Sequence, residues 1–175
     1  MCEDKEYAGT LCLGTSTDTQ DREGAVLEKR LVPDLDEVTV RAAFEKFRGD
    51  FYQIPPMVSA IKHGGVPLYK LARQGKVVER EPRLVHVYRY AIEKIALPKI
   101  DFRVLCSKGF YVRTYAHEIG AALGCGGHLH SLRRTKSGRF DLSRAITVDE
   151  IRSAEPVDIL DKILPLPEVS RMRGA

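Results

Sequence analysis

The sequence has few of the features that mark secreted, membrane or disulfide-stabilised proteins. Its 175 residues include only four cysteines, and no two of them form a C-x-x-C pair. No run approaches the roughly 18 to 20 apolar residues that a membrane span needs, and the first residues lack the apolar region of a secretory signal. Repeats and low-complexity segments are absent too. These absences predict reduced thiols, a cytoplasmic location and no membrane partner.

Positive charge is concentrated in one part of the chain. The formal net charge is only +4, but from Arg103 to Arg144 eight Lys and Arg residues stand against two acidic residues, and the remaining residues sum to −2. Basic charge gathered on one segment is typical of a protein that binds a polyanion. A charged face that contacts only solvent is the alternative that the pattern leaves open.

Apolar periodicity predicts a mixture of strands and helices in one main domain, residues 1–164. Period-two patterns predict strands over 5–14, 25–32, 83–97 and 100–106, and a turn at Pro98-Lys99 joins the last two. Helical spacing predicts helices over 68–74, 111–123, 147–154 and 157–164 and one that Thr39 caps and Gly49 ends. Residues 50–65 are predicted to be irregular, and 165–175 a C-terminal tail. Because strands and helices do not alternate regularly, the predicted class is α+β.

The most informative stretch is the junction between the strand ending at Cys106 and the helix that starts near Tyr111. Lys108, Tyr111 and Arg113 lie at or near this junction. The free N–H groups at a helix start favour anions, and a guanidinium there could hold a carboxylate or phosphate by two parallel hydrogen bonds. A surface arginine on a helix that merely packs against a sheet is the competing interpretation.

Six blocks of sequence, taken in order, resemble the bacterial tRNA pseudouridine-55 synthase family of the TruB type. The blocks are KEY at 5–7, TDTQD at 17–21, QIPPMVSAIK at 53–62, GVPLYKLARQG at 65–75, CSKGFYVRT at 106–114, and GCGGH at 124–128 running on to LRR at 132–134. The resemblance covers residues 5 to about 164. It implies the pseudouridine synthase catalytic fold, a mixed, mainly antiparallel sheet with flanking helices.

The resemblance also implies a reaction and a partner. Family members isomerise a uridine to pseudouridine in the T-loop of tRNA (position 55): the C1′–N1 bond breaks, the uracil turns, and a C1′–C5 bond forms. The reaction needs no metal and no organic cofactor. Because the target base must leave its stack, the site must hold a flipped nucleotide. The expected partner is therefore the T-arm of tRNA.

Individual site residues follow from the matched blocks. Tyr7 matches the tyrosine that packs on the uracil and is placed for proton removal at C5, and Arg113 matches the arginine that forms a salt bridge with the catalytic aspartate. For Tyr7 the alternative is a core tyrosine of a strand, and for Tyr111 and Leu132 it is core packing. The residues implied in substrate binding line the base pocket or carry charge near RNA: Tyr111, Leu132, Lys62, Lys108, Arg133, Arg134 and Lys136.

The sequence departs from the family pattern at both ends. The family's catalytic aspartate lies in a Gly-x-Leu-Asp stretch upstream of Lys-x-Tyr, and only residues 1–4 precede Lys5. We therefore expect the nucleophile to lie on a missing N-terminal segment, the catalytic domain to be incomplete and this chain to be inactive alone. Cys12 stands in the wrong register to replace it, and Asp18 and Asp21 are more typical of loop-structuring residues. A PUA-type RNA-binding domain is also expected to be missing after about Leu164.

Two other functions remain open at this level. The first is an RNA-binding or tRNA-folding module without catalysis, which would use the same basic surface to contact phosphates and shape. The second is a metal site, although the spacing matches no standard zinc motif. Its candidate ligands are His117, Cys125, His128 and His130, with or without Cys106.

Overall fold

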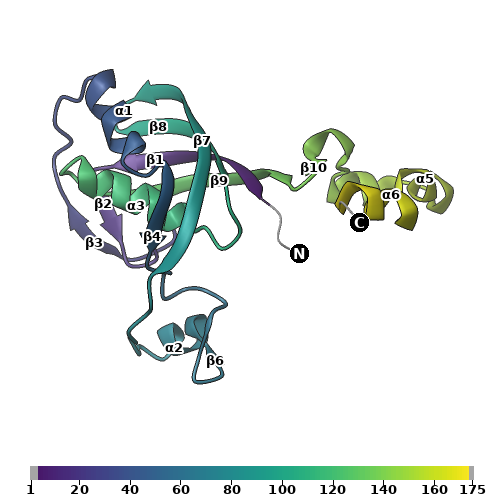
Figure 1. Cartoon of the computed structure of the whole chain (residues 1–175), viewed down its shortest axis with the longest axis horizontal. Helices are drawn as coiled ribbons and strands as arrows, with labels where there is room; N and C mark the ends of the chain where they lie inside the picture. The colour runs from purple at the N-terminus through teal and green to yellow at the C-terminus, as the bar shows by residue number, and fades with distance from the viewer. Residues whose placement is uncertain (1–3, 174–175) are drawn as a thin grey trace.

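A six-stranded antiparallel sheet forms the centre of the computed structural model, which describes residues 4–173 (Figure 1). The strand order is β10-β9-β1-β8-β7-β4. The bounds are β1 Lys5–Leu13, β4 Gly49–Gln53, β7 Arg83–Ala96, β8 Lys99–Cys106, β9 Gly127–Ser137 and β10 Phe140–Asp141. Two small hairpins lie outside it: β2 Thr15–Thr17 with β3 Val26–Lys29, and β5 Lys62–His63 with β6 Val66–Pro67. The predicted α+β class with a mainly antiparallel sheet is confirmed.

Strand β8 shows why the central strands form where the sequence places them. Its even-numbered residues from Ile100 to Cys106 are all 0% exposed, whereas the odd-numbered ones are partly exposed or exposed. This period of two buries one face of the strand. The neighbouring β1 and β7 pair with β8 in antiparallel register. The strands predicted over 5–14, 83–97 and 100–106 are therefore confirmed, and the one predicted over 25–32 is the shorter β3.

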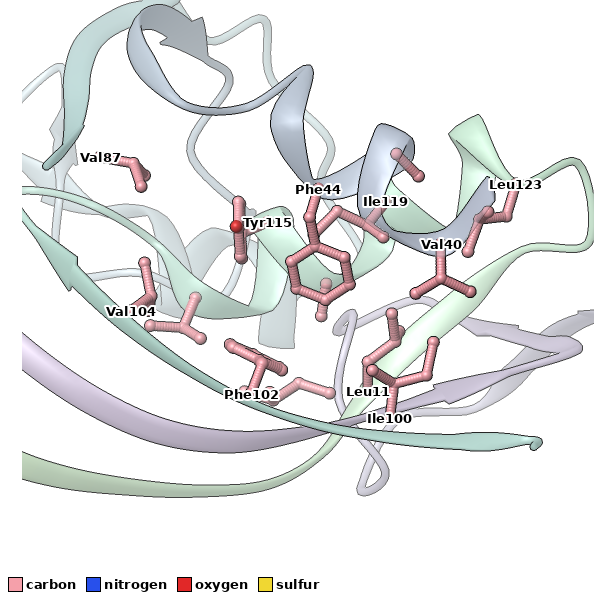
Figure 2. Packing of buried hydrophobic residues seen from close by; sticks show 14 of the residues in the cluster. Leu11, Val40, Phe44, Val87, Ile100, Phe102, Val104, Tyr115, Ile119 and Leu123 are labelled. Carbon is pink, nitrogen blue, oxygen red and sulfur yellow. The ribbon is translucent and has the colours of Figure 1, made fainter. Parts of the chain in front are cut away.

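Two helices, α1 Glu37–Glu45 and α3 Val112–Ala122, cover one face of the sheet. Figure 2 shows Phe44 of α1 and Tyr115 of α3 packed above Phe102 of β8. The ring centroids of Tyr115 lie 5.9 Å from those of both Phe44 and Phe102. Edge-to-face aromatic pairs of this kind add about 0.5–1.5 kcal/mol each beyond the area they bury. The layer between helices and sheet is thus the hydrophobic core.

The predicted cap of α1 is wrong. Asp36, not Thr39, is the N-cap residue, because its carboxylate accepts a hydrogen bond from the Thr39 backbone N–H at 2.7 Å. Asp and Thr both suit this position, so the spacing alone does not choose between them. The helix also ends at Glu45, and Gly49, with φ +77°, starts the next strand instead of closing the helix.

Three segments have more regular structure than the sequence indicates. Strand β4 lies in a stretch predicted to be irregular, and it pairs with β7 from Gly49↔Val87 to Gln53↔Arg83. The basic segment after Leu132 forms the outer half of β9. The residues predicted as a tail contain α6 Leu166–Arg173. The pairing partners of β4 and β9 are distant in sequence, so local patterns do not reveal either strand.

Two parts of the chain lie away from the sheet (Figure 1). Residues 54–82 form an insertion between β4 and β7 that contains the β5–β6 hairpin and α2 Leu68–Arg73. Beyond β10 come a short 3-10 helix, Leu142–Arg144, then α4 Val148–Ser153, α5 Pro156–Lys162 and α6. A capping box between Thr147 and Glu150 opens α4, which lies where the sequence predicts a helix over 147–154. Within residues 4–173, no helix has the length and apolar character to cross a membrane.

Helix α3 approaches the start of β9 so closely that only glycine fits between them. A Cβ placed on Gly120 would lie 2.4 Å from the backbone N of Gly127 and 2.6 Å from the carbonyl carbon of Gly126. The Gly126 N–H also donates to the Gly120 carbonyl oxygen at 2.9 Å. The glycine pair after α3 therefore has a packing role in the contact between the helix and β9.

Replacing Gly120 with alanine tests this contact. Gly→Ala inside a helix normally stabilises it by about 1 kcal/mol, but here the added methyl group meets backbone and should lower the free energy of unfolding by about 1–3 kcal/mol. Urea denaturation gives the value. The matched control is Ala121→Gly at the next, exposed position, which should lose about 1 kcal/mol through helix propensity alone. A higher urea midpoint for G120A would contradict the packing argument.

Candidate functional site

An open cavity of about 470 Å³ lies at the N-terminal end of α3, between β1, β9 and the loop that follows β2. Tyr7 of β1, Asp21 of the loop, Tyr111 and Arg113 at the start of α3, and Leu132 of β9 all line it. Four of these five residues are among those that the sequence predicts for the site. They come from segments up to 125 positions apart, and the sheet and α3 bring them together.

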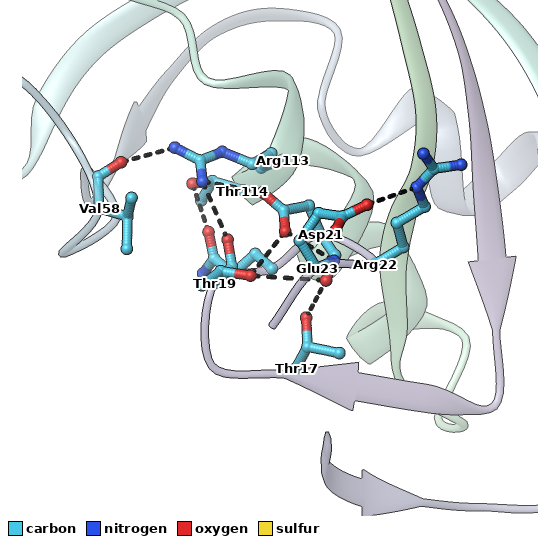
Figure 3. A network of polar contacts seen from close by, with 9 residues as sticks. Thr17, Thr19, Asp21, Arg22, Glu23, Val58, Arg113 and Thr114 are labelled. Carbon is cyan, nitrogen blue, oxygen red and sulfur yellow. Dashed lines mark hydrogen bonds and ion pairs between the residues drawn. The ribbon is translucent and has the colours of Figure 1, made fainter. Parts of the chain in front are cut away.

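Arg113 occupies the first turn of α3, as the sequence predicts, and contacts three acceptors (Figure 3). Its Nη1 donates to Asp21 Oδ2 at 3.0 Å and to the Thr19 carbonyl oxygen at 3.4 Å. Its Nη2 donates to the Val58 carbonyl oxygen at 2.6 Å. The expected pair of parallel hydrogen bonds to one carboxylate does not form, because Nη2 donates to Val58 in the insertion and not to Asp21. The guanidinium nevertheless holds a carboxylate in the pocket.

Asp21 is the residue of the cavity lining that pairs with Arg113, and the sequence interpretation did not assign it to the site. It does structure its loop, as predicted, because Oδ1 accepts hydrogen bonds from Thr19 Oγ1 at 2.7 Å and from the Glu23 N–H at 3.1 Å. Its other oxygen faces Arg113, with the two side chains only 25% and 21% exposed. The signal available in the sequence was its place in the TDTQD block, between two other matched blocks of the site.

The loop that carries Asp21 is fixed from both sides. Gln20 has a φ of +64°, in the left-handed region that few side chains adopt. Its side-chain oxygen accepts from Thr114 Oγ1 at 2.8 Å, and its carbonyl oxygen accepts from the Leu129 N–H at 3.0 Å. Helix α3 and strand β9 therefore both hold the loop, and they point the Asp21 carboxylate into the cavity.

The Asp21 carboxylate is ionised at neutral pH. Burial raises its pKa, but the hydrogen bonds from Thr19, Arg113 and the Glu23 N–H, together with the charge of Arg113, outweigh burial and lower the pKa below its usual value. A stable anion paired with a fixed guanidinium is an arrangement that orients charge inside a cavity.

Tyr7, Leu132 and Arg134 lie on the same face of the sheet as α3. Residues directly opposite each other in an antiparallel pair project from the same face, and the register pairs Tyr7 with Arg134 and Gly9 with Leu132. Burial raises the pKa of the Tyr7 hydroxyl, and Arg134 only partly offsets this effect. Tyr7 therefore presents a neutral, protonated phenol to the cavity, and Arg134 supplies positive charge beside it.

The structure does not gather the other predicted binding residues at this cavity. The register pairs Arg133 with Ala8 and Lys136 with Glu6, so both basic residues belong to the opposite face of the sheet. Lys62 lines a separate cavity of about 390 Å³ in the insertion. Lys108 is exposed in the turn before α3. The predicted basic segment is thus divided between the two faces of β9.

The residues of the metal-site alternative are occupied by other contacts. His117 Nδ1 lies 3.3 Å from the Gly127 carbonyl oxygen, His128 Nδ1 lies 2.9 Å from the Thr15 carbonyl oxygen, and His130 Nε2 lies 3.2 Å from Lys99 Nζ. Among the described residues, no group of three or more His, Cys, Asp or Glu side chains could hold a metal ion. Cys12, Cys106 and Cys125 are free thiols, and Cys2 lies outside the described residues.

Comparison with known proteins agrees with this geometry. Residues 1–112 match the model of the TruB family pseudouridylate synthase (N terminal domain), and residues 113–166 match the tRNA pseudouridylate synthase B C-terminal domain. A tRNA pseudouridine synthase B of Opitutus terrae is 51% identical over 168 residues, which are 96% of this chain and 66% of that protein. One of Burkholderia mallei is 48% identical over 171 residues, 93% of this chain and 56% of that protein.

Solved structures show the same fold. A Cbf5-Nop10-Gar1 complex contains a chain that superposes with a TM-score of 0.64 at 27% identity, over 92% of this chain and 39% of that chain. An H/ACA RNP bound to a substrate RNA containing 2′-deoxyuridine gives a TM-score of 0.60 at 23% identity and supports the fold alone. The sheet with α1 and α3 on one face is therefore the catalytic fold of a pseudouridine synthase.

Within that class, the chain belongs to the TruB family. It spans about half to two thirds of the length of the curated relatives it matches.

The Arg113–Asp21 pair can be tested by titration. In Arg113→Gln, Asp21 loses a charged partner, so its pKa should rise toward the ordinary value, as carbon-13 NMR of the carboxyl group would show. A carboxylate with a lowered native pKa stabilises the fold above its unfolded pKa of about 3.8 and loses this contribution as the pH falls through the native pKa. R113Q should therefore lose less stability than the wild type below that pH.

The internal control for this titration is Glu6, whose carboxylate is held on the opposite face of the sheet. Burial raises the pKa of Glu6, but hydrogen bonds from Thr135, Arg89 and Arg103, together with the charge of Arg103, outweigh burial. The pKa of Glu6 therefore lies below its usual value. Arg113 is not among those partners, so the Glu6 titration should not change in R113Q. An unchanged Asp21 titration would show that the pair does not persist in solution.

Proposed function

We propose that this chain forms the base-handling part of a cytoplasmic tRNA pseudouridine synthase that acts on a uridine in the T-loop. The observation that supports this function best is the meeting of Tyr7, Arg113 and Leu132, from three separate matched blocks, in one cavity. At about 470 Å³ the cavity is within the range of small-ligand sites. It is open to solvent, as a site for a base that swings out of an RNA stack must be.

The side chains suggest how the base is held. The ring of Tyr7 packs on the uracil, a contact that for base–aromatic stacking contributes roughly 1–3 kcal/mol. Tyr111 and Leu132 line the remaining sides, and Arg134 lies near the phosphate backbone that enters the cavity. In the isomerisation the C1′–N1 bond breaks, the C1′–C5 bond forms, and C5 loses a proton while N1 gains one. We assign the Tyr7 hydroxyl, which lines the cavity, to the removal of the C5 proton: its oxygen accepts that proton as its own proton passes to water.

Arg113 is the group that orients the nucleophile. We infer that the nucleophilic aspartate is supplied by a segment outside this chain and accepts hydrogen bonds from the in-plane N–H groups of Arg113 that the three present acceptors leave, since a guanidinium has five such donors. Asp21 and the Thr19 carbonyl oxygen hold Nη1, and the Val58 carbonyl oxygen holds Nη2, so the guanidinium plane is fixed before that aspartate arrives. A fixed positive charge keeps a carboxylate ionised and aimed, as a nucleophile requires.

Release of tritium from the uracil C5 of a tRNA transcript tests the reaction. The chain alone should release none, and addition of a separately made upstream segment with the Gly-x-Leu-Asp motif should restore release. In that mixture, Arg113→Ala should lower turnover by about 100-fold or more while tRNA binding stays largely intact. Release from the chain alone would contradict the missing nucleophile and would point to a carboxylate within the chain, with Asp21 the first to test. Equal losses of turnover and binding would exclude the assigned role of Arg113.

The salt dependence of tRNA binding tests the basic surface. Arg134→Ala should weaken binding and lower the slope of log Kd against log salt by about 1, the value expected for the loss of one phosphate contact. The matched control is Arg133→Ala, one position along the same strand on the opposite face, which should change the slope less. Salt-sensitive binding without turnover in any mixture shown to fold would favour a non-catalytic RNA-binding module. A slope for R134A equal to that of the wild type would remove Arg134 from the RNA interface.

A further inference from the structure

Gln53 is a buried polar residue whose whole amide group is used by one other residue. It is the last residue of β4 and is only 1% exposed. Its Nε2 donates to the Tyr111 carbonyl oxygen at 3.1 Å, and its Oε1 accepts from the Tyr111 N–H at 2.9 Å. The side chain thus pairs with the Tyr111 backbone as a neighbouring strand would. A buried amide costs free energy unless both its donor and its acceptor are satisfied.

The residue that Gln53 holds is the one that starts α3. Tyr111 is the N-cap residue, with extended backbone (φ −105°, ψ 104°), and its side chain makes no capping hydrogen bond. Its carbonyl oxygen also accepts from the Tyr115 N–H at 3.0 Å in the first turn. Gln53 therefore fixes the point at which the turn after β8 becomes helix. This point is Tyr111, two residues before Arg113.

The same stretch of chain contacts the pocket a second time. The insertion begins directly after Gln53, and five residues later the Val58 carbonyl oxygen accepts from Arg113 Nη2. The chain from Gln53 to Val58 is thus attached to the start of α3 at two places, once through the Tyr111 backbone and once through the Arg113 side chain. Both contacts involve residues that line the base cavity.

We propose that Gln53 is a positioning residue for the pseudouridine synthase reaction. By pairing with both backbone polar groups of Tyr111, it sets the direction in which Tyr111 and Arg113 leave the start of α3, and so the geometry of the base pocket. The consequence for turnover rests on the proposed function, whereas the consequence for the Tyr111 backbone does not. The two are measured separately below.

The rate of amide hydrogen exchange at Tyr111 measures directly how well Gln53 protects the Tyr111 N–H. In Gln53→Leu, which keeps the bulk but removes both hydrogen bonds, the Tyr111 N–H should exchange about tenfold faster than in the wild type. Amides in the middle of β8 should keep their wild-type rates. The matched control is Tyr52→Ala, the preceding residue of β4, whose side chain is 69% exposed. It should leave the Tyr111 rate unchanged. An unchanged Tyr111 rate in Q53L would overturn the proposal.

Gln53→Glu gives a second test in nearly the same shape. A protonated carboxyl group has one acceptor and one O–H donor, as the amide does, whereas the carboxylate places an oxygen against the Tyr111 carbonyl oxygen. Protection of the Tyr111 N–H relative to wild type should therefore be close to normal at pH 5 and about tenfold lower at pH 9. Q53L should show no such dependence. Equal protection at both pH values would contradict the pairing of this side chain with the Tyr111 backbone. The comparison tests that pairing even if Q53L does not fold.

Turnover and binding separate positioning from general stability. In the mixture with the upstream segment, Q53L should lower kcat about tenfold or more, with Kd for the tRNA changed less than about threefold and the urea midpoint close to that of Y52A. Parallel losses in kcat, Kd and urea midpoint would reduce Gln53 to a structural residue. If wild-type mixtures show no turnover, the proposed function fails, and the exchange rate of Tyr111 still decides whether Gln53 sets the pocket.

Discussion

The contact that places every part of the pocket is the packing of Tyr115 in the middle of the aromatic core. Its ring meets those of Phe44, Phe47, Phe102 and Phe110, at centroid distances from 5.3 to 6.1 Å. These rings come from α1, β8 and the segments beside them, so one side chain ties α3 to both layers. The cluster holds the helix in one position over the sheet, with its first turn at the cavity. On the other side, the glycines let α3 approach the start of β9 closely enough for the Gly126 N–H to donate to the Gly120 carbonyl oxygen.

Much of this arrangement can be predicted from the sequence, because it depends on local periodicity. The alternation in β8 and the helical spacing of Val112, Tyr115 and Ile119 place the strand, the turn and the helix, and so place Arg113 in a first turn. Family blocks then identify Tyr7 and Tyr111 as neighbours in space. The inferences from periodicity use residues within about one element of one another, whereas the relation of Tyr7 to Tyr111 rests on the likeness to the family blocks.

The remainder depends on pairings that local patterns do not encode. Asp21 and Arg113 are 92 positions apart. The left-handed turn at Gln20 directs Asp21 toward Arg113, and no glycine at that position indicates such a turn in the sequence. The faces of Arg133 and Arg134 follow from the register of β9 on β1, which shifts twice along the strand. A one-residue shift exchanges the two faces of a strand, so a basic segment in the sequence does not reveal which of its charges reach the pocket.

The pairing of Gln53 with Arg83 has a further consequence for how the chain can vary. The insertion leaves the sheet and returns to it at two residues that already face each other across β4 and β7. From the standpoint of the sheet, residues 54–82 are therefore the loop of a hairpin whose ends stay fixed. Loop closure changes free energy only with the logarithm of length, by about 0.6 kcal/mol per doubling. Residues 54–82 can therefore be lengthened, shortened or exchanged at little cost to the sheet, as long as Val58 still reaches Arg113 at the start of α3.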